Sequence, residues 1–125
     1  MMRESPLFVK LFAFVTWVIP LTTKFPRAQR FVVAEALQRV TLATHEAAIR
    51  AGHAKEAAII ATSLDDVALN LALTRFYVRL AHQLALITVQ QYEYASQSLT
   101  EVGRLLEAWR RVNATKQAVS GGATA

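Results

Sequence analysis

Apolar residues recur every three or four positions along most of the chain, and short polar or proline-containing segments interrupt this pattern three times. Recurrence at these spacings places apolar side chains on one face of a helix. No stretch alternates strictly between apolar and polar residues as a half-buried strand does, and no long internal repeat is present. The sequence therefore predicts an all-α protein of four helices. Short connections between long helices favour an up-down-up-down four-helix bundle.

Serine and proline define the start of the first helix. Ser5 fits an N-cap, and Pro6 fits the first helical position, where a backbone N–H has no helical partner. The helix should run to about Ile19 or a little beyond, because Pro20 should end or kink it. The apolar segment 7–21 is shorter than the roughly 20 residues of a membrane span, and no convincing signal-peptide cleavage site follows it. We therefore expect a buried bundle helix and no membrane partner.

The second helix should extend from Pro26 to Ala51, with Gly52 as its C-terminal stop. Its apolar positions are spaced by three and four residues, as in a coiled coil, and small side chains occupy its second half. The seam consists of Val33, Leu37, Val40, Thr44, Ala47 and Ala51, and Thr44 is its one polar member.

A third helix should begin near Ala54 and reach about Gln83 or Leu84, and it carries two apolar seams. The first seam consists of Ala57, Ile60, Leu64, Val67, Leu71, Thr74 and Val78. The second seam consists of Leu69, Leu73, Phe76 and Leu80. A helix with two apolar faces needs neighbours on two sides. Either both seams lie inside one core, or the second seam faces another subunit.

The segment Thr-Val-Gln-Gln at positions 88–91 fits a capping box and predicts the start of the fourth helix. The apolar seam of this helix is Tyr92, Ala95, Leu99, Val102, Leu106 and Trp109. Gly103 costs about 1 kcal/mol relative to alanine inside a helix, so a neighbouring group should approach closely there. The helix should end near Asn113. We therefore expect a bundle of residues 1–113 and a flexible C-terminal tail of residues 114–125.

Composition and motifs exclude several functional classes. The chain has 125 residues, which suffice for one domain with its own core. It has no cysteine, so disulfides and thiolate chemistry are excluded, and a reducing, cytoplasmic location is expected. His-Glu-x-x-His, paired Glu-x-x-His, glycine-rich phosphate loops and Gly-x-Ser-x-Gly are all missing. We therefore expect no enzymatic activity, no metal site and no cofactor.

Arginines carry most of the candidate chemistry. Fourteen Lys and Arg residues against nine Asp and Glu residues give a formal net charge of +5, which favours nucleic acid, anionic lipid or an acidic partner. Three pairs of arginines share a helix face or turn: Arg75 with Arg79, Arg27 with Arg30, and Arg104 with Arg111. Guanidinium groups arranged in this way suit phosphates or carboxylates. The alternative is pairing within the protein, which Glu101 and Glu107 favour for Arg104.

Three segments, taken together, resemble the Avd-like four-helix-bundle family over about residues 7–112. They are Phe25-Pro26-Arg27 with Arg30-Phe31, the run Leu73-Thr-Arg-Phe-Tyr-Val-Arg-Leu80, and Glu101-Val-Gly-Arg-Leu-Leu106 with Trp109. The chain departs from the family at Glu107-Ala108, where glycine often precedes the tryptophan. The family includes the accessory variability determinant proteins of diversity-generating retroelements and bundle proteins encoded in intervening sequences of bacterial ribosomal RNA genes.

The resemblance implies a four-helix bundle that assembles as a pentameric barrel and has no catalytic residues. Retroelement members bind their reverse transcriptase and, through a basic surface, RNA or cDNA, and they support error-prone cDNA synthesis. We therefore expect a non-catalytic accessory protein whose partners are a reverse transcriptase, RNA or cDNA, and further copies of itself. Arg75 and Arg79 are the leading binding residues, and Arg27, Arg30, Arg104 and Arg111 follow. The alternative is a scaffold protein of the intervening-sequence type without a retroelement role.

Overall fold

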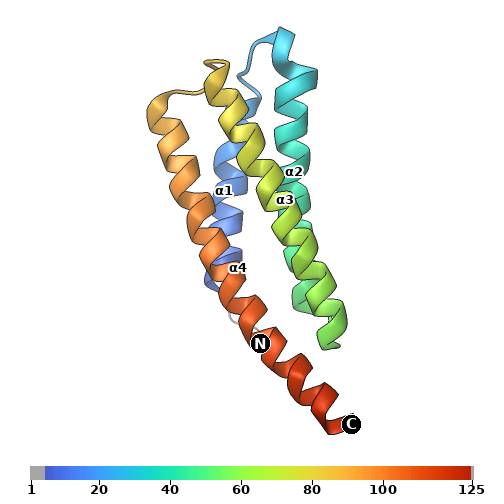
Figure 1. Cartoon of the computed structure of the whole chain (residues 1–125). Helices are drawn as coiled ribbons and strands as arrows, with labels where there is room; N and C mark the ends of the chain where they lie inside the picture. Colours follow the sequence, from blue (N-terminus) through green and yellow to red (C-terminus); the bar gives the residue numbers. More distant parts are fainter. Residues whose placement is uncertain (1–4, 125) are drawn as a thin grey trace.

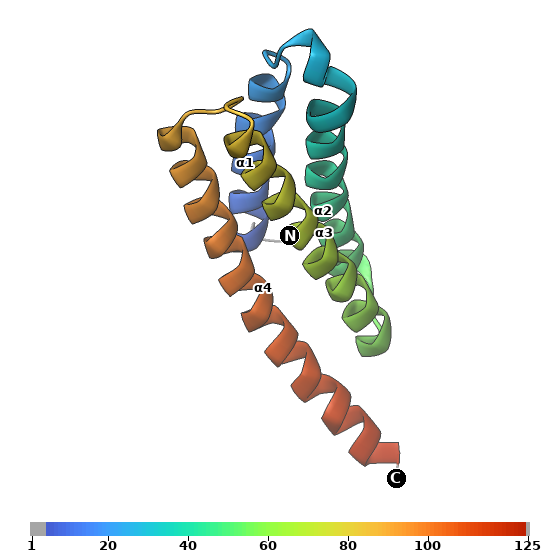
Figure 2. The ribbon, with the colours of Figure 1, turned by 45° about the horizontal axis from the view of Figure 1, so that its top comes forward.

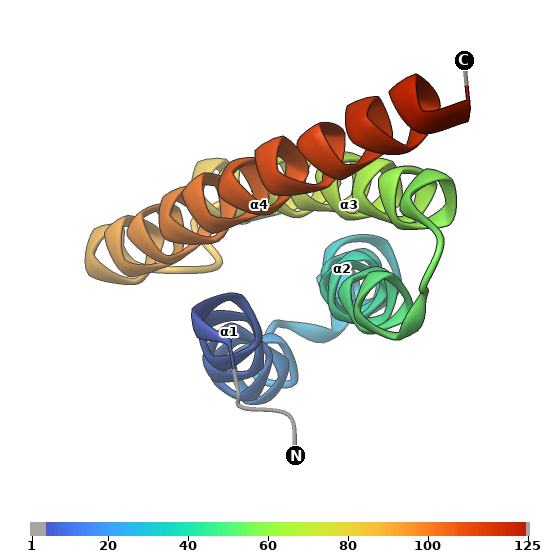
Figure 3. The same cartoon turned by 90° about the horizontal axis from the view of Figure 1, so that it is seen from below.

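Four long helices form an antiparallel bundle in the computed structural model, which describes residues 5–124 (Figure 1). They are α1 (Pro6–Thr22), α2 (Glu35–His53), α3 (Ala57–Gln83) and α4 (Val89–Thr124). Each helix packs against the next in the chain, and α4 closes the bundle against α1. Seen along the bundle in Figure 3, α1 and α3 lie at opposite corners. The prediction of an all-α, up-down-up-down four-helix bundle is confirmed.

One face of every helix contributes to the core. The largest fully buried side chains are Phe14, Leu37, Leu64, Leu99 and Leu106. The most extensive contact joins α2 and α3, because buried alanines such as Ala47 and Ala51 let the two helices approach closely. At this contact the hydroxyl oxygens of Thr44 and Thr74 lie 3.4 Å apart, and each hydroxyl donates to a carbonyl of its own helix. The polar member of the second-helix seam is therefore satisfied inside the core.

The first helix begins where expected and ends a little beyond Ile19, as expected. The Ser5 hydroxyl accepts a hydrogen bond from the backbone N–H of Phe8 at 3.4 Å, which confirms the N-cap. Pro20 lies inside α1 and does not end it, since the helix continues to Thr22. The Thr22 hydroxyl donates to the carbonyl oxygen of Ile19 at 2.7 Å and so provides a hydrogen-bond donor to a carbonyl of the last turn.

The second helix begins directly after Pro26, close to the expected start, but its first turns are not regular α-helix. A 3-10 turn, η1 (Arg27–Gln29), is followed by a π-helical turn, η2 (Arg30–Ala34), before α2 begins. A π turn holds one more residue than an α turn. Within η2, Val33 and Ala34 are buried in the core, whereas Phe31 and Val32 are exposed to solvent.

Gly52 does not stop the second helix, which ends one residue later at His53. A glycine stop needs a left-handed backbone, and none of the glycines in the described part of the chain has a positive φ. Gly52 instead makes room for α1, because a Cβ atom there would lie 3.3 Å from Cζ of Phe8. The residue that follows His53, Ala54, is extended, which also moves the start of α3 from the expected Ala54 to Ala57.

The connection between α3 and α4 is closed by short-range hydrogen bonds. The Thr88 hydroxyl accepts from the backbone N–H of Gln91 at 3.0 Å, and the Gln91 side chain accepts from the N–H of Thr88 at 2.8 Å. This reciprocal pair confirms the capping box. At the end of α3, the N–H of Leu86 donates to the carbonyl of Ala81 across Ala85, whose φ is 60°. Alanine therefore occupies a position that usually holds glycine.

The fourth helix does not end near Asn113 but continues to Thr124. Figures 1 and 2 show its last turns projecting beyond the other three helices. Residues 114–119 are exposed, so no core contact requires this extension, and alanine, lysine and glutamine in it are good helix formers. The expected boundary between the bundle and the tail, at residues 113 and 114, therefore lies inside α4 and not at its end. Residue 125 of the expected tail lies outside the described residues.

Helix α3 is the one described helix whose length and composition would suit a membrane span. Core helices of water-soluble bundles meet the same test. Here α3 packs between α2 and α4. Helix α1, which contains the apolar segment 7–21, has 17 residues and is shorter than a span requires.

Candidate nucleic-acid and partner interface

Arg75 is tied to the neighbouring helix. Its Nη2 donates to the backbone carbonyl of Leu99 on α4 at 2.9 Å. It also lies 3.4 Å from the position that a Cβ atom of Gly103 would occupy, so the expected close approach at Gly103 is made by this guanidinium. The side chain is nevertheless exposed. Arg75 therefore stabilises the α3–α4 contact, whether or not its outer edge also binds a ligand.

Arg79, one turn further along α3, is in a different position. It is exposed, and within residues 5–124 no carboxylate forms an ion pair with it. His82, three residues after Arg79, continues the line of Arg75 and Arg79 along α3, and it stacks on Tyr92 of α4 with ring centroids 4.4 Å apart and an angle of 11° between the planes. Two of the three residues in this line thus join α3 to α4. Arg79 is the member whose guanidinium is left for an external anion.

Arg27 and Arg30 lie at the end of the bundle, in the irregular segment between α1 and α2. Both are exposed. Arg30 and Phe31 line a hollow of about 460 Å³ together with the end of α1 and the start of α2. Figure 2 shows that this segment and the α3–α4 connection lie at the same end of the molecule. Arg79, near the end of α3, belongs to the same half of the bundle.

Arg104 and Arg111 lie on α4 and are further from this end. Arg104 forms an ion pair with Glu101, as the spacing suggested, whereas Glu107 pairs with a different arginine, Arg110. Arg111 is exposed and lines a separate hollow of about 310 Å³ near the start of α3. The six candidate arginines therefore do not form one site.

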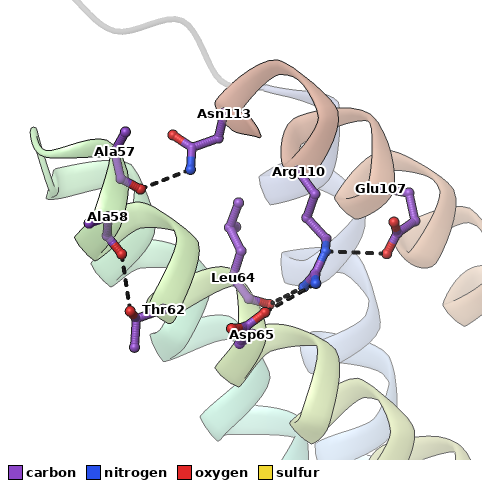
Figure 4. A network of polar contacts seen from close by, with 8 residues as sticks. All are labelled: Ala57, Ala58, Thr62, Leu64, Asp65, Glu107, Arg110 and Asn113. Atoms are coloured by element: carbon purple, nitrogen blue, oxygen red, sulfur yellow. Dashed lines mark hydrogen bonds and ion pairs between the residues drawn. The ribbon is translucent and has the colours of Figure 1, made fainter. Parts of the chain in front are cut away.

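Two residues that the sequence analysis did not single out hold α4 to the start of α3 (Figure 4). Arg110 forms an ion pair with Asp65 at 3.1 Å and donates to the backbone carbonyl of Leu64 at 3.3 Å. Asn113 is 3% exposed and donates from Nδ2 to the carbonyl of Ala57 at 2.9 Å. A signal for Asn113 existed, because it continues the apolar seam of the fourth helix four residues after Trp109.

His45 has a pKa that its surroundings lower. Its ring makes an edge contact with Phe8 on α1, with centroids 6.2 Å apart, and its Nδ1 is buried without a hydrogen-bond partner in the described part of the chain. Burial lowers the pKa of His45 below its ordinary value of 6.5, and the nearby Glu46 carboxylate partly opposes this shift. This arrangement favours a neutral, structural histidine over a metal ligand.

Acidic and histidine side chains do not converge anywhere in the described residues. No group of three or more His, Cys, Asp or Glu side chains lies close enough to hold a metal ion there. The described residues therefore provide no cluster suited to metal chemistry.

The comparison with known families decides the classification. The model of the bAvd-like family matches residues 7–113. The chain belongs to the bAvd-like family. No curated protein matches it in sequence.

Solved structures agree with the fold of this bAvd-like protein. One is a protein of unknown function of the S23 ribosomal protein family from Bacteroides thetaiotaomicron. It is 21% identical, with a TM-score of 0.78, and the match covers 84% of this chain and 95% of that chain. At this identity the likeness shows a shared four-helix fold and not a shared function.

Proposed function

We propose that this bAvd-like protein is a non-catalytic, cytoplasmic accessory protein of a diversity-generating retroelement. It binds the reverse transcriptase and RNA or cDNA through a basic surface, and it supports mutagenic cDNA synthesis. The observation that carries the proposal is Arg79, an exposed arginine without an ion-pair partner in the described chain, in a segment that resembles the family. A guanidinium in this state is available for phosphate or for a carboxylate of a partner.

Assembly into a ring, a homopentamer by family resemblance, is part of this proposal. The second seam of α3 supports it, because Leu69 and Phe76 are 60% and 55% exposed in the single chain. On α1, Val9 and Phe12 are also exposed. These two apolar faces lie on helices at opposite corners of the bundle (Figure 3). Contact between unlike faces of successive copies produces a head-to-tail interface, which closes into a ring when the rotation permits.

The binding experiment uses Arg79→Glu and not a double change with Arg75, because loss of the Arg75–Leu99 hydrogen bond would mix stability with binding. Each protein is tested for binding to a labelled RNA and for capture of the reverse transcriptase of the proposed retroelement. Arg39→Glu, at an exposed position of α2 outside every candidate pair, is the matched control for net charge.

We expect Arg79→Glu to weaken both interactions and Arg39→Glu to leave them nearly unchanged. For single-stranded RNA, each lost phosphate contact should reduce the slope of log affinity against log salt by about 0.7. If Arg79→Glu binds both partners like the natural protein, this surface is not the interface. A scaffold protein of the intervening-sequence type is then the better description.

A further inference from the structure

The end of the bundle that holds the α1–α2 segment has three basic side chains against one acidic side chain, Glu35, which directly follows the segment. Between positions 18 and 34 the chain has Lys24, Arg27 and Arg30 and no Asp or Glu. All three side chains are exposed. The neighbouring α3–α4 connection, residues 83–92, contains no Asp, Glu, Lys or Arg. This end therefore attracts an anionic partner.

The same end exposes an aromatic ring. Phe31 is 75% exposed, the largest exposed fraction among the large apolar side chains described. It follows Arg30 directly and lies in the π-helical turn η2, a type of irregularity that is frequent at functional sites. An aromatic face beside guanidinium groups is the combination by which proteins bind single-stranded nucleic acid, since every base can stack on it.

The hollow that Phe31 lines also has polar side chains in its lining. Its lining is Thr22, Thr23, Arg30, Phe31, Ala34, Glu35 and Gln38. Gln38 donates from Nε2 to the Thr22 hydroxyl at 2.8 Å, which holds the amide and leaves its carbonyl oxygen as an acceptor. Glu35 adds an exposed carboxylate. These acceptors suit the amino groups of bases or the hydroxyls of ribose.

We propose that this end of the bundle binds single-stranded RNA or cDNA, with one base stacked on Phe31 and the flanking phosphates bound by Arg27 and Arg30. This inference rests on the proposed function, and it specifies that the bound nucleic acid is a single strand with an unstacked base. A duplex keeps its bases stacked and cannot use Phe31 in this way.

The test measures binding of fluorescein-labelled oligouridylate and of an RNA duplex of equal length to the full chain. Phe31→Leu keeps an apolar side chain and removes the flat ring, whereas Phe31→Tyr keeps the ring. Val32→Ala is the matched control, because Val32 is 64% exposed next to Phe31 but cannot stack. Circular dichroism verifies that each variant is folded, which is expected since both positions are exposed. Binding to vesicles that contain phosphatidylserine is measured in parallel.

We expect the single strand to bind more tightly than the duplex, and Phe31→Leu to weaken single-strand binding by about tenfold. Phe31→Tyr and Val32→Ala should stay within about twofold of the natural protein. Equal binding by Phe31→Leu and the natural protein overturns the inference but leaves the proposed function intact if Arg79→Glu still weakens binding. Equal losses for Phe31→Leu and Val32→Ala, or Phe31-dependent binding to vesicles without binding to RNA, also overturn it in favour of an apolar contact. A natural protein that binds no RNA contradicts both proposals.

Discussion

The guanidinium of Arg75 on α3 lies 3.4 Å from the place where a side chain of Gly103 on α4 would begin. From this position it donates to the carbonyl of Leu99, one turn before the glycine. Arg75 on α3 and Gly103 on α4 are thus parts of one contact between the two helices. The glycine provides room for the arginine, and the arginine satisfies a carbonyl on the facing helix.

The size of the side chain at Gly103 should decide whether this contact survives. In Gly103→Ala the new Cβ would lie at van der Waals distance from the flexible end of Arg75, and the helix gains up to about 1 kcal/mol. Gly103→Leu should displace Arg75 and lose about 1 kcal/mol with the hydrogen bond. Urea denaturation measures both changes. A marked loss of stability in Gly103→Ala would mean that the helices have no room even for a methyl group.

Asn113 should be intolerant of a negative charge. Its Nδ2 donates to the carbonyl of Ala57, and its Oδ1 is buried without a partner in the described residues (Figure 4). Asn113→Asp replaces the donor by an acceptor beside that carbonyl and should lower the free energy of unfolding by about 2 kcal/mol. The control is Asn70→Asp on α3, because Asn70 donates only within its own helix. Equal effects of the two changes in thermal denaturation would show that the Asn113–Ala57 bond has no special role.

Stability should depend on pH through His45. Because its pKa is lowered in the folded protein, the unfolded chain binds more protons between that value and 6.5. Stability is therefore highest where the histidine is neutral in both states, and it falls as pH drops from about 6.5 towards the lowered pKa.

The measurement for His45 is the melting temperature between about pH 5 and pH 7.5 for the natural protein and for His45→Leu. We expect the leucine variant to lose part of the acid sensitivity, since no proton can be placed beside Phe8. Replacement of the exposed His53 by glutamine, at the end of the same helix, is the control. Parallel curves for the natural protein and the leucine variant would contradict the prediction.

The outer face of α3 should mediate assembly. Phe76→Glu and Leu69→Glu each place a charge in this face, so we expect a ring to dissociate into folded monomers, because an unpaired charge is costly inside an apolar contact. Light scattering after size-exclusion chromatography measures the mass, and circular dichroism measures the helix content. Gln97→Glu, exposed on α4, is the control. A natural protein that is monomeric at micromolar concentration would refute the ring.

Local patterns in the sequence were sufficient for much of the fold. The N-cap at Ser5 and the capping box at Thr88 depend on residues three positions apart, and the structure has both where the sequence predicts them. Gly52 shows where such local patterns fail. A glycine near a helix end usually marks a stop, but here Phe8 of another helix requires the space.

The sequence by itself determined four helices, their order and their buried seams, because periodicity and capping act between residues less than two turns apart. Only the tertiary structure decided that Leu69 and Phe76 of the second seam of α3 are exposed while Leu73 and Leu80 pack against the core. It also decided that Arg75 is held by Leu99 and that Arg79 is not paired within the described chain. These outcomes depend on which surfaces of other helices lie opposite each residue. A helical repeat specifies a direction around one helix, and it contains no information about what occupies that direction.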